Sequence, residues 1–211
     1  GKLGKDVLGN DIAADAGETM DIPVGEGVEQ RSDGRFYATQ VGVPLIDTAA
    51  GISLQSTLTH SGDVNLSTGN IEFSGDAVIK GAVESGAYVF VKGNLTVEGG
   101  IRGGEVICGG DLIVNGGIVA ARNVFAKGEI KAEFLDNSKV SSNGAILIRK
   151  SIMSSRVASG TTIQVGENND GKVIGGLIIA REALQCGHIG APRAVTTEIE
   201  VGADWRMQVT L

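Results

Sequence analysis

The repeat of this chain begins at Gly75-Asp76-Ala77-Val78-Ile79-Lys80-Gly81, where a glycine and an acid precede an alternating apolar pair and a second glycine. The pattern returns as Gly93-Asn94-Leu95-Thr96-Val97-Glu98-Gly99 and as Gly110-Asp111-Leu112-Ile113-Val114-Asn115-Gly116. Weaker copies start at Gly128, Gly144 and Gly160, so successive units lie 18, 17, 18, 16 and 16 residues apart. A unit this short has no room for a strand and a helix, and we expect each one to form a single coil of short strands and turns.

The apolar residues of each unit fall at three places, which predicts a three-sided tube. The first place holds an alternating pair, and period two puts both side chains on one face of a strand. The pairs are Ala77/Ile79, Leu95/Val97, Leu112/Val114, Ile130/Ala132 and Ile146/Ile148. The second place holds Val83, Ile101, Ile118, Leu135 and Ile152, and the third holds Val89, Val106, Val124, Val140 and Val157. We therefore predict an all-β fold, a single-stranded parallel β-helix of about six coils that stack about 4.8 Å apart.

A competing pattern concerns the hand of this helix. Apolar residues recur every six positions at Ile71, Ala77, Val83, Val89, Leu95, Ile101, Ile107, Ile113, Val119 and Phe125. This spacing is typical of the left-handed β-helix of hexapeptide acyltransferases. It ends at Lys131, whereas the glycine units continue with unequal lengths, and the small residue expected after each apolar one is mostly missing. We therefore predict a right-handed helix.

Composition sets limits on partners and compartment. Glycine is abundant (33 residues) and proline is rare (3 residues), which suits many tight turns between short strands. The net charge of −7, without a basic stripe, argues against a nucleic-acid partner. Cys108 and Cys186 lie far apart and do not suggest a disulfide framework, so we expect a cytoplasmic protein. No apolar run approaches the length of a membrane span, and we expect no membrane insertion.

The two ends differ from the repeat. Residues 1–55 contain short apolar runs between Asp-Gly and glycine-rich turns, such as Ser32-Asp33-Gly34-Arg35, and predict a small β-rich module. We assign residues 56–202 to the β-helix and residues 203–211 to a C-terminal end segment. In that segment Trp205 and Met207 are expected to help cover the end of the tube, where strand edges are otherwise unpaired.

The polar residues of the repeat are expected to be structural. Asp76, Asp111 and Glu129 would stack along one edge, but Asn94, Ala145 and Thr161 interrupt a carboxylate ladder that could bind cations. Asp and Asn instead stabilise turns by accepting hydrogen bonds from backbone N–H groups. The predicted structural turn positions are Gly75, Asp76, Gly93, Asn94, Gly110, Asp111, Gly128, Gly144 and Gly160.

No residue set predicts catalysis, a metal or a cofactor. Cys186 and His188 would point the same way on a strand, but a zinc site normally needs four ligands and no companion pair appears. Cys108 continues an inward pattern and is expected to pack as a small apolar residue. His60 lacks the orienting partner of a general base, and we expect it in a loop.

The sequence resembles the flagellar assembly protein A family. The resemblance covers almost the whole chain and is carried by these stretches: Val7-Leu8-Gly9-Asn10-Asp11-Ile12 with Gly17, Gly25-Glu26-Gly27-Val28, Gly69-Asn70-Ile71-Glu72-Phe73-Ser74-Gly75-Asp76, Gly171-Lys172-Val173-Ile174-Gly175-Gly176, and Ile189-Gly190 with Thr197–Gly202. It implies a right-handed parallel β-helix, a cytoplasmic protein and a role in flagellar assembly or in its placement at the cell pole. It also implies protein partners, such as a soluble component of the sugar phosphotransferase system.

Together these features favour a non-enzymatic scaffold whose outward faces bind proteins. Val78, Ile113 and Val119, if they point outward, are the candidate contact residues. One alternative is a carbohydrate-active enzyme or acyltransferase, but the loops are short apart from Gly166–Gly171. The other is a polymer-forming cytoskeletal protein similar to bactofilins, whose coils stack head to tail into a homo-oligomer.

Overall fold

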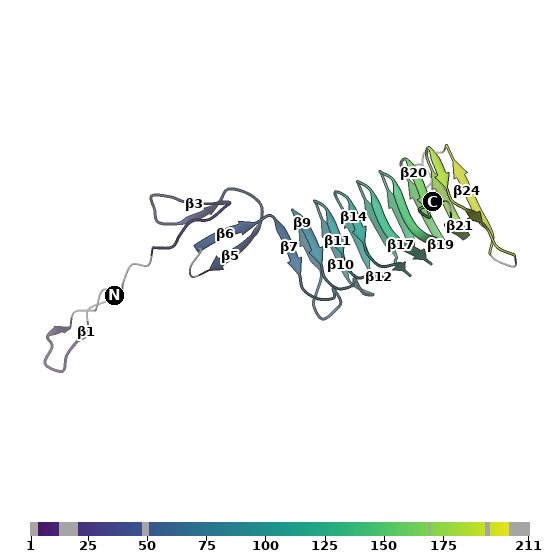
Figure 1. The fold of residues 1–211 in the computed structure, drawn as a ribbon. Helices are drawn as coiled ribbons and strands as arrows, with labels where there is room; N and C mark the ends of the chain where they lie inside the picture. The colour runs from purple at the N-terminus through teal and green to yellow at the C-terminus, as the bar shows by residue number, and fades with distance from the viewer. Residues whose placement is uncertain (1–3, 13–20, 48–50, 169, 193–194, 203–211) are drawn as a thin grey trace.

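The chain forms a β-solenoid that extends from a set of small hairpins (Figure 1). This computed structural model describes residues 4–12, 21–47, 51–168, 170–192 and 195–202. The solenoid makes about eight turns between residues 57 and 201, and every pairing between its coils is parallel. The predicted all-β parallel β-helix is therefore confirmed, while its right hand stays a prediction. Among the described residues no helix is long and apolar enough to cross a membrane.

Within the described part of the chain, three antiparallel strand pairs precede the solenoid. They are β1 (Gly4–Lys5) with β2 (Asp11–Ile12), β3 (Val28–Gln30) with β4 (Phe36–Ala38), and β5 (Val43–Asp47) with β6 (Gly51–Gln55). A parallel bridge between Val24 and Ile52 joins the stretch before β3 to β6. The first solenoid strand begins two residues after β6 ends, at Thr57.

The strands of the solenoid form three faces, named here in the order in which the chain visits them. Face 1 consists of β7 (Thr57–His60), β9 (Asp76–Ile79), β11 (Leu95–Val97), β14 (Leu112–Val114), the first parts of β17 (Ile130–Asp136) and β19 (Ile146–Ser159), β20 (Thr162–Val165) and β22 (Ala183–Gln185). Face 2 consists of β12 (Ile101–Arg102), β15 (Ile118–Val119), later parts of β17 and β19, the first part of β21 (Lys172–Ala180) and β23 (His188–Ile189).

Face 3 completes each coil. It consists of β8 (Ile71–Phe73), β10 (Tyr88–Val91), β13 (Glu105–Cys108), β16 (Asn123–Ala126), β18 (Lys139–Ser142), the last parts of β19 and β21, and β24 (Thr197–Val201). Because β19 and β21 continue from one face to the next, they bend around the corners of the tube.

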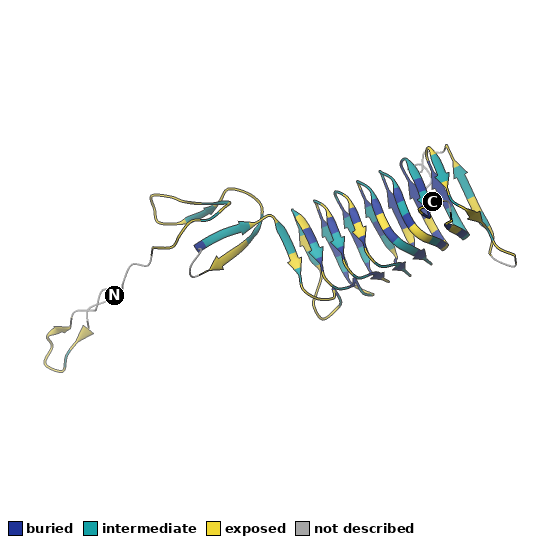
Figure 2. Cartoon of the chain, viewed as in Figure 1, coloured by how far each residue is buried: buried dark blue, intermediate teal, exposed yellow. Residues whose placement is uncertain are grey.

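The interior of the tube is built from the apolar ladders that the sequence predicts. Leu95 of face 1, Ile101 of face 2 and Val106 of face 3 are all fully buried. The other predicted inward residues also belong to this one core cluster, which runs along the solenoid axis (Figure 2). Burial of a Val, Leu or Ile side chain contributes about 1.5–3 kcal/mol, so stacking of coils supplies the main stabilisation.

The six-residue spacing of apolar residues does not follow the interior of the tube beyond Ile101. Ile71, Val83 and Ile101 belong to the interior, but Ile107 pairs with Phe125 on the ladder that alternates with the inward Val106 and Cys108. The coil from Leu95 to Leu112 is 17 residues long instead of 18, as the register of β11 with β14 shows. A slip of one residue moves an alternating ladder to the other face of a strand. The interior therefore follows the glycine units of unequal length and not the six-residue spacing.

Candidate docking groove

The predicted turn residues line the corner between face 3 and face 1. The backbone N–H of Asn94 donates to Asp76 Oδ1 (2.7 Å), that of Asp111 donates to Asn94 Oδ1 (2.9 Å), and that of Glu129 donates to Asp111 Oδ1 (2.7 Å). Each side chain thus accepts from the next coil along the axis, whereas Asp and Asn in isolated turns usually bind their own turn. The result is a row of hydrogen bonds that fixes the register between coils.

The glycines of the same corner form a second row. The N–H groups of Gly93, Gly110, Gly128 and Gly144 each donate to the carbonyl of the preceding glycine, which for Gly93 is Gly75. A Cβ on Gly110 would lie 3.0 Å from the backbone of Gly93, so a larger residue does not fit between stacked coils.

Gly160 does not continue this row. It donates to Ser142 O, and the register of Ser142 with Ser159 places Gly160 opposite Asn143. The position equivalent to Gly144 is occupied by Thr161, because the coil contains 17 residues between Ile146 and Ile163. The predicted unit starting at Gly160 is therefore displaced by one residue, although Gly160 still lies in the corner.

Backbone carbonyl groups inside this corner accept hydrogen bonds from short side chains. Ser142 Oγ donates to Gly128 O, and Ser159 Oγ donates to Gly144 O (2.7 Å). Cys108 belongs to the same inward ladder and its Sγ lies 3.2 Å from Gly93 O. Burial raises the pKa of the Cys108 thiol, which therefore stays protonated and acts as a weak donor.

The remaining candidate residues are separated by the structure. His60 is the last residue of β7, where it pairs with Ile79, and its Nε2 lies 3.2 Å from Asp63 O; the expectation of a loop position is wrong because the solenoid starts one coil before the first glycine unit. Cys186 packs against the core whereas His188 is exposed, so they do not share a side. Among the described residues no three His, Cys, Asp or Glu side chains cluster as metal ligands would.

A groove with a volume of about 340 Å³ lies on the outside of face 1. Its floor is formed by four outward residues on consecutive coils, Ile113, Lys131, Leu147 and Gln164. Ile113 is 39% exposed and Leu147 is half-buried, so the floor is apolar on both sides of the Lys131 side chain. Lys131 Nζ lies 2.6 Å from Glu129 Oε1, and this hydrogen bond raises the pKa of the lysine.

The corner between face 1 and face 2, beside the groove, changes length from coil to coil. Three residues separate the inward Val114 from Ile118, two separate Ala132 from Leu135, and seven separate Val165 from Val173. Glu133 of the short corner and Glu167 of the long corner both line the groove. A shift of register between Ala132 and Phe134 marks the irregular coil.

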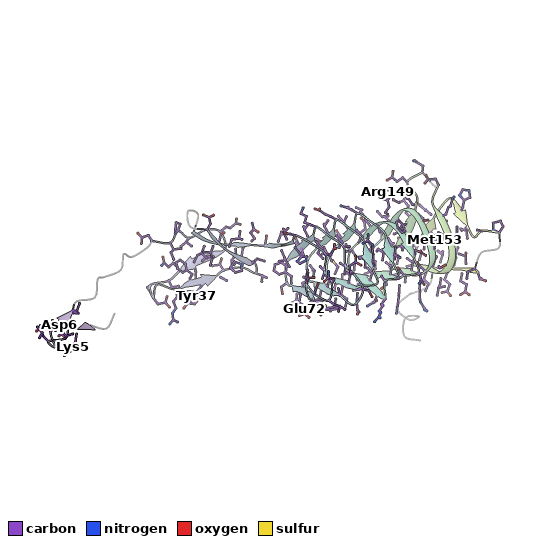
Figure 3. The ribbon with its side chains drawn as sticks, turned by 90° about the horizontal axis from the view of Figure 1, so that it is seen from below. Lys5, Asp6, Tyr37, Glu72, Arg149 and Met153 are labelled. Atoms are coloured by element: carbon purple, nitrogen blue, oxygen red, sulfur yellow. The ribbon has the colours of Figure 1, made fainter. Side chains whose placement is uncertain are left out.

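This irregularity also assembles the charged wall of the groove. β19 carries two residues, Arg149 and Lys150, opposite the single Glu133 of β17. Glu133 accepts from Arg149 Nη1 (3.1 Å) and pairs with Lys150 Nζ (2.7 Å), while Arg149 Nε lies 3.3 Å from Glu167 Oε1. The hydrogen bond from Lys150 is the main reason that the pKa of Glu133 is lowered. Figure 3 shows Arg149 at the outer rim of the solenoid.

Only one of the three candidate contact residues lies in the groove. Ile113 forms part of its floor. Val78 lies on the same outward ladder two coils earlier, with Thr96 between them, and is half-buried. Val119 points outward from face 2, where it pairs with Arg102 and Asp136.

Sequence analysis missed the other groove residues, because only the register between coils brings them together. The groove combines apolar floor contacts with ion pairs whose orientation is fixed, which is an arrangement suited to binding a complementary surface. The floor residues stand on strands rather than on loops, so their spacing is held by the interior ladders.

The comparisons with known proteins identify the solenoid. The family model described as the flagellar assembly protein A β-solenoid domain matches residues 56–209. Searches of the curated proteins and of the solved structures gave no match. Since the matched segment covers most of the chain and coincides with the coils described above, the chain belongs to the flagellar assembly protein A β-solenoid domain family.

Proposed function

We propose that this chain is a non-enzymatic scaffold that serves flagellar assembly, or its placement at the cell pole, by holding a soluble protein partner in the groove on face 1. The observation that carries the proposal is the apolar floor of the exposed Ile113 and the half-buried Leu147 beside the ion pair of Glu133 and Arg149. Membership of the flagellar assembly protein A family supports the biological role.

The partner is expected to insert apolar side chains on both sides of Lys131 and to place polar groups against the wall. Binding energy in such interfaces is concentrated in a few central, desolvated contacts, and surrounding charges contribute more to orientation than to affinity. The resemblance to the family favours a soluble component of the sugar phosphotransferase system as this partner, in the cytoplasm.

The role is tested in a strain that lacks the gene and is complemented with the full-length protein. Loss or misplacement of flagella in the deletion strain, restored by the wild-type gene, is the expected result. Ile113→Arg and Leu147→Arg should fail to restore flagella while the protein level remains normal, because each puts a charge on the apolar floor. Val78→Arg, on the same ladder outside the groove, and Val119→Arg, on face 2, are the matched controls and should restore swimming.

Two outcomes would contradict the proposal. Normal flagella in the deletion strain would remove the flagellar role, and equal activity of all four variants would remove the groove as the docking site. The biochemical measurement is binding of purified sugar-phosphotransferase proteins to the wild type and to the same four variants. A sediment that grows with protein concentration would instead support the polymer-forming alternative.

A further inference from the structure

Face 3 carries an apolar stripe on its outer surface. Phe90 of β10 pairs with Ile107 of β13, and Ile107 pairs with Phe125 of β16, so the three side chains stand on consecutive coils. They alternate with the inward residues of the same strands, and each is half-buried. These three residues are named here the outer stripe, which Glu72, labelled in Figure 3, and Ser141 bound at its two ends.

The outer stripe differs from the matching outward ladders of the other two faces. On face 1 the apolar Ile113 stands between Thr96 and Lys131. On face 2 Val119 pairs with the charged Arg102. Outward positions of a sheet that faces water are usually polar, and neighbouring apolar side chains on a surface mark a contact with another molecule.

The two sides of the outer stripe carry opposite charges. Glu105 precedes its own stripe residue, Ile107, by two positions. Lys92 and Lys127 are exposed and follow their stripe residues by two positions, on the coils before and after that of Glu105. Gly109 occupies the equivalent position between the two lysines. At a rise of about 3.3 Å per residue, the acidic and the basic side both lie about 7 Å from the stripe.

We propose that face 3 joins two copies of this chain, which pack side by side about a two-fold axis parallel to the axis of the solenoid. Such an axis superposes the two stripes and exchanges the acidic side with the basic side. Each residue of the outer stripe then faces its own counterpart. Glu105 of one copy lies between Lys92 and Lys127 of the other, where Gly109 has no side chain to fill the space.

The charges favour a second copy in this direction. If the two solenoids were antiparallel, with Ile107 again facing its counterpart, Glu105 would face Glu105 of the other copy, and like charges across a contact are unfavourable. In the parallel arrangement an acid meets two bases on each side of the axis. Glu72 faces its counterpart only at the exposed end of the stripe, where charges contribute little. A second copy thus supplies both the apolar stripe and the complementary charges in one surface.

This dimer goes beyond the docking role proposed for face 1 and does not depend on it. Face 1 takes no part in the contact, so one dimer presents two grooves. A partner with two matching sites would bind the pair of grooves more tightly than either groove alone.

Sedimentation equilibrium of the full chain should show a reversible equilibrium between monomer and dimer. Ile107→Glu should weaken the dimer by more than about a hundredfold, because it puts two carboxylates opposite each other at the centre of the contact. Ile113→Glu, an outward substitution on face 1, is the matched control and should leave dimerisation unchanged. Far-UV circular dichroism verifies that each variant is folded.

The direction of the two copies is tested by exchanging charges. Glu105→Lys alone should be monomeric, and so should the double variant Lys92→Glu/Lys127→Glu, since each brings like charges together on both sides of the axis. A mixture of the two variants should form a mixed dimer, because acids and bases then meet again on both sides.

Several results would overturn the proposal. A wild-type chain that stays monomeric at every concentration would do so, as would a dimer that survives Ile107→Glu. Charge-exchanged variants that do not combine would also overturn it, and this result decides the matter if Ile107→Glu does not fold. Assemblies that grow beyond the dimer with concentration would show contact through the ends of the solenoid instead of face 3.

Discussion

The coils before Ile118 and the coils after Ile130 have the same kind of interior but different corners. In both halves the inward positions of the three faces are buried and apolar. The early coils have three residues at the corner between face 1 and face 2, whereas the later ones have two, three and seven. The inward ladders therefore decide the fold, and the corners beside the groove are where the two halves differ.

The largest loss of stability is expected when an inward residue of a strand is truncated, and truncation of its outward neighbour serves as the comparison. Leu112 is fully buried and its neighbour Ile113 is 39% exposed on β14. Leu112→Ala should cost about 2–5 kcal/mol, because it leaves a cavity in a close-packed interior. Ile113→Ala should cost less than about 1 kcal/mol, since a surface position tolerates truncation.

The measurement is the midpoint of urea unfolding of each variant, monitored by circular dichroism. Solenoids do not always unfold in a single step, so midpoints of the same transition are compared. Equal losses for the two variants would mean that the assignment of inward and outward faces on β14 is wrong.

A smaller loss of stability is expected from substitutions at the corner between face 3 and face 1. In the early coils Asp111 Oδ1 accepts the N–H of Glu129, whereas the later coils rely on Ser142 and Ser159. Asp111→Ala removes one acceptor and should cost about 1 kcal/mol, the usual net value of such a hydrogen bond. Asp111→Asn keeps the Oδ1 acceptor and should restore most of the stability, as Asn94 does in the preceding coil.

This comparison can fail in an informative way. If Asp111→Asn were as unstable as Asp111→Ala, the negative charge rather than the hydrogen bond would matter at this corner. High salt should then reduce the difference in thermal midpoint between the wild type and both variants, because salt screens a charge effect and leaves a hydrogen bond largely unchanged.

The interior was predictable from the sequence because each inward position is marked by the alternation of apolar residues within its own strand. Period two identifies the strands, and the repetition of Leu95/Val97 as Leu112/Val114 identifies the stacked partners. The errors arose where coil length changes. The 17-residue coil between Ile146 and Ile163 moved the glycine row past Gly160 to Thr161.

The groove was not predictable in the same way. Its floor needs Ile113, Lys131 and Leu147 on consecutive coils, and its wall needs Glu133 opposite both Arg149 and Lys150. Each residue taken singly looks like an ordinary surface residue, and only the register between coils brings them together. The exposure of Ile113 was predicted from alternation, since that depends on its own strand alone.

The smallest change in stability is expected from the ion pairs in the wall of the groove. Glu133 has a lowered pKa, mainly because Lys150 donates a hydrogen bond to it. A carboxylate with a depressed pKa in the folded state adds stability above the ordinary glutamate pKa, and that contribution is lost as the pH falls through the folded value. The pair is accessible to solvent, so its contribution to stability should be slight.

The pKa itself is the better measurement, by carboxyl carbon NMR over an acid titration. Glu133 should titrate below an ordinary glutamate, and Lys150→Met should return it toward the usual value while Arg149 keeps part of the effect. Glu98, paired with Lys80 in a regular coil, serves as the comparison. If Lys150→Met left the Glu133 titration unchanged, the two-against-one register of β19 and β17 would not be what holds the wall together, and the groove would need another cause.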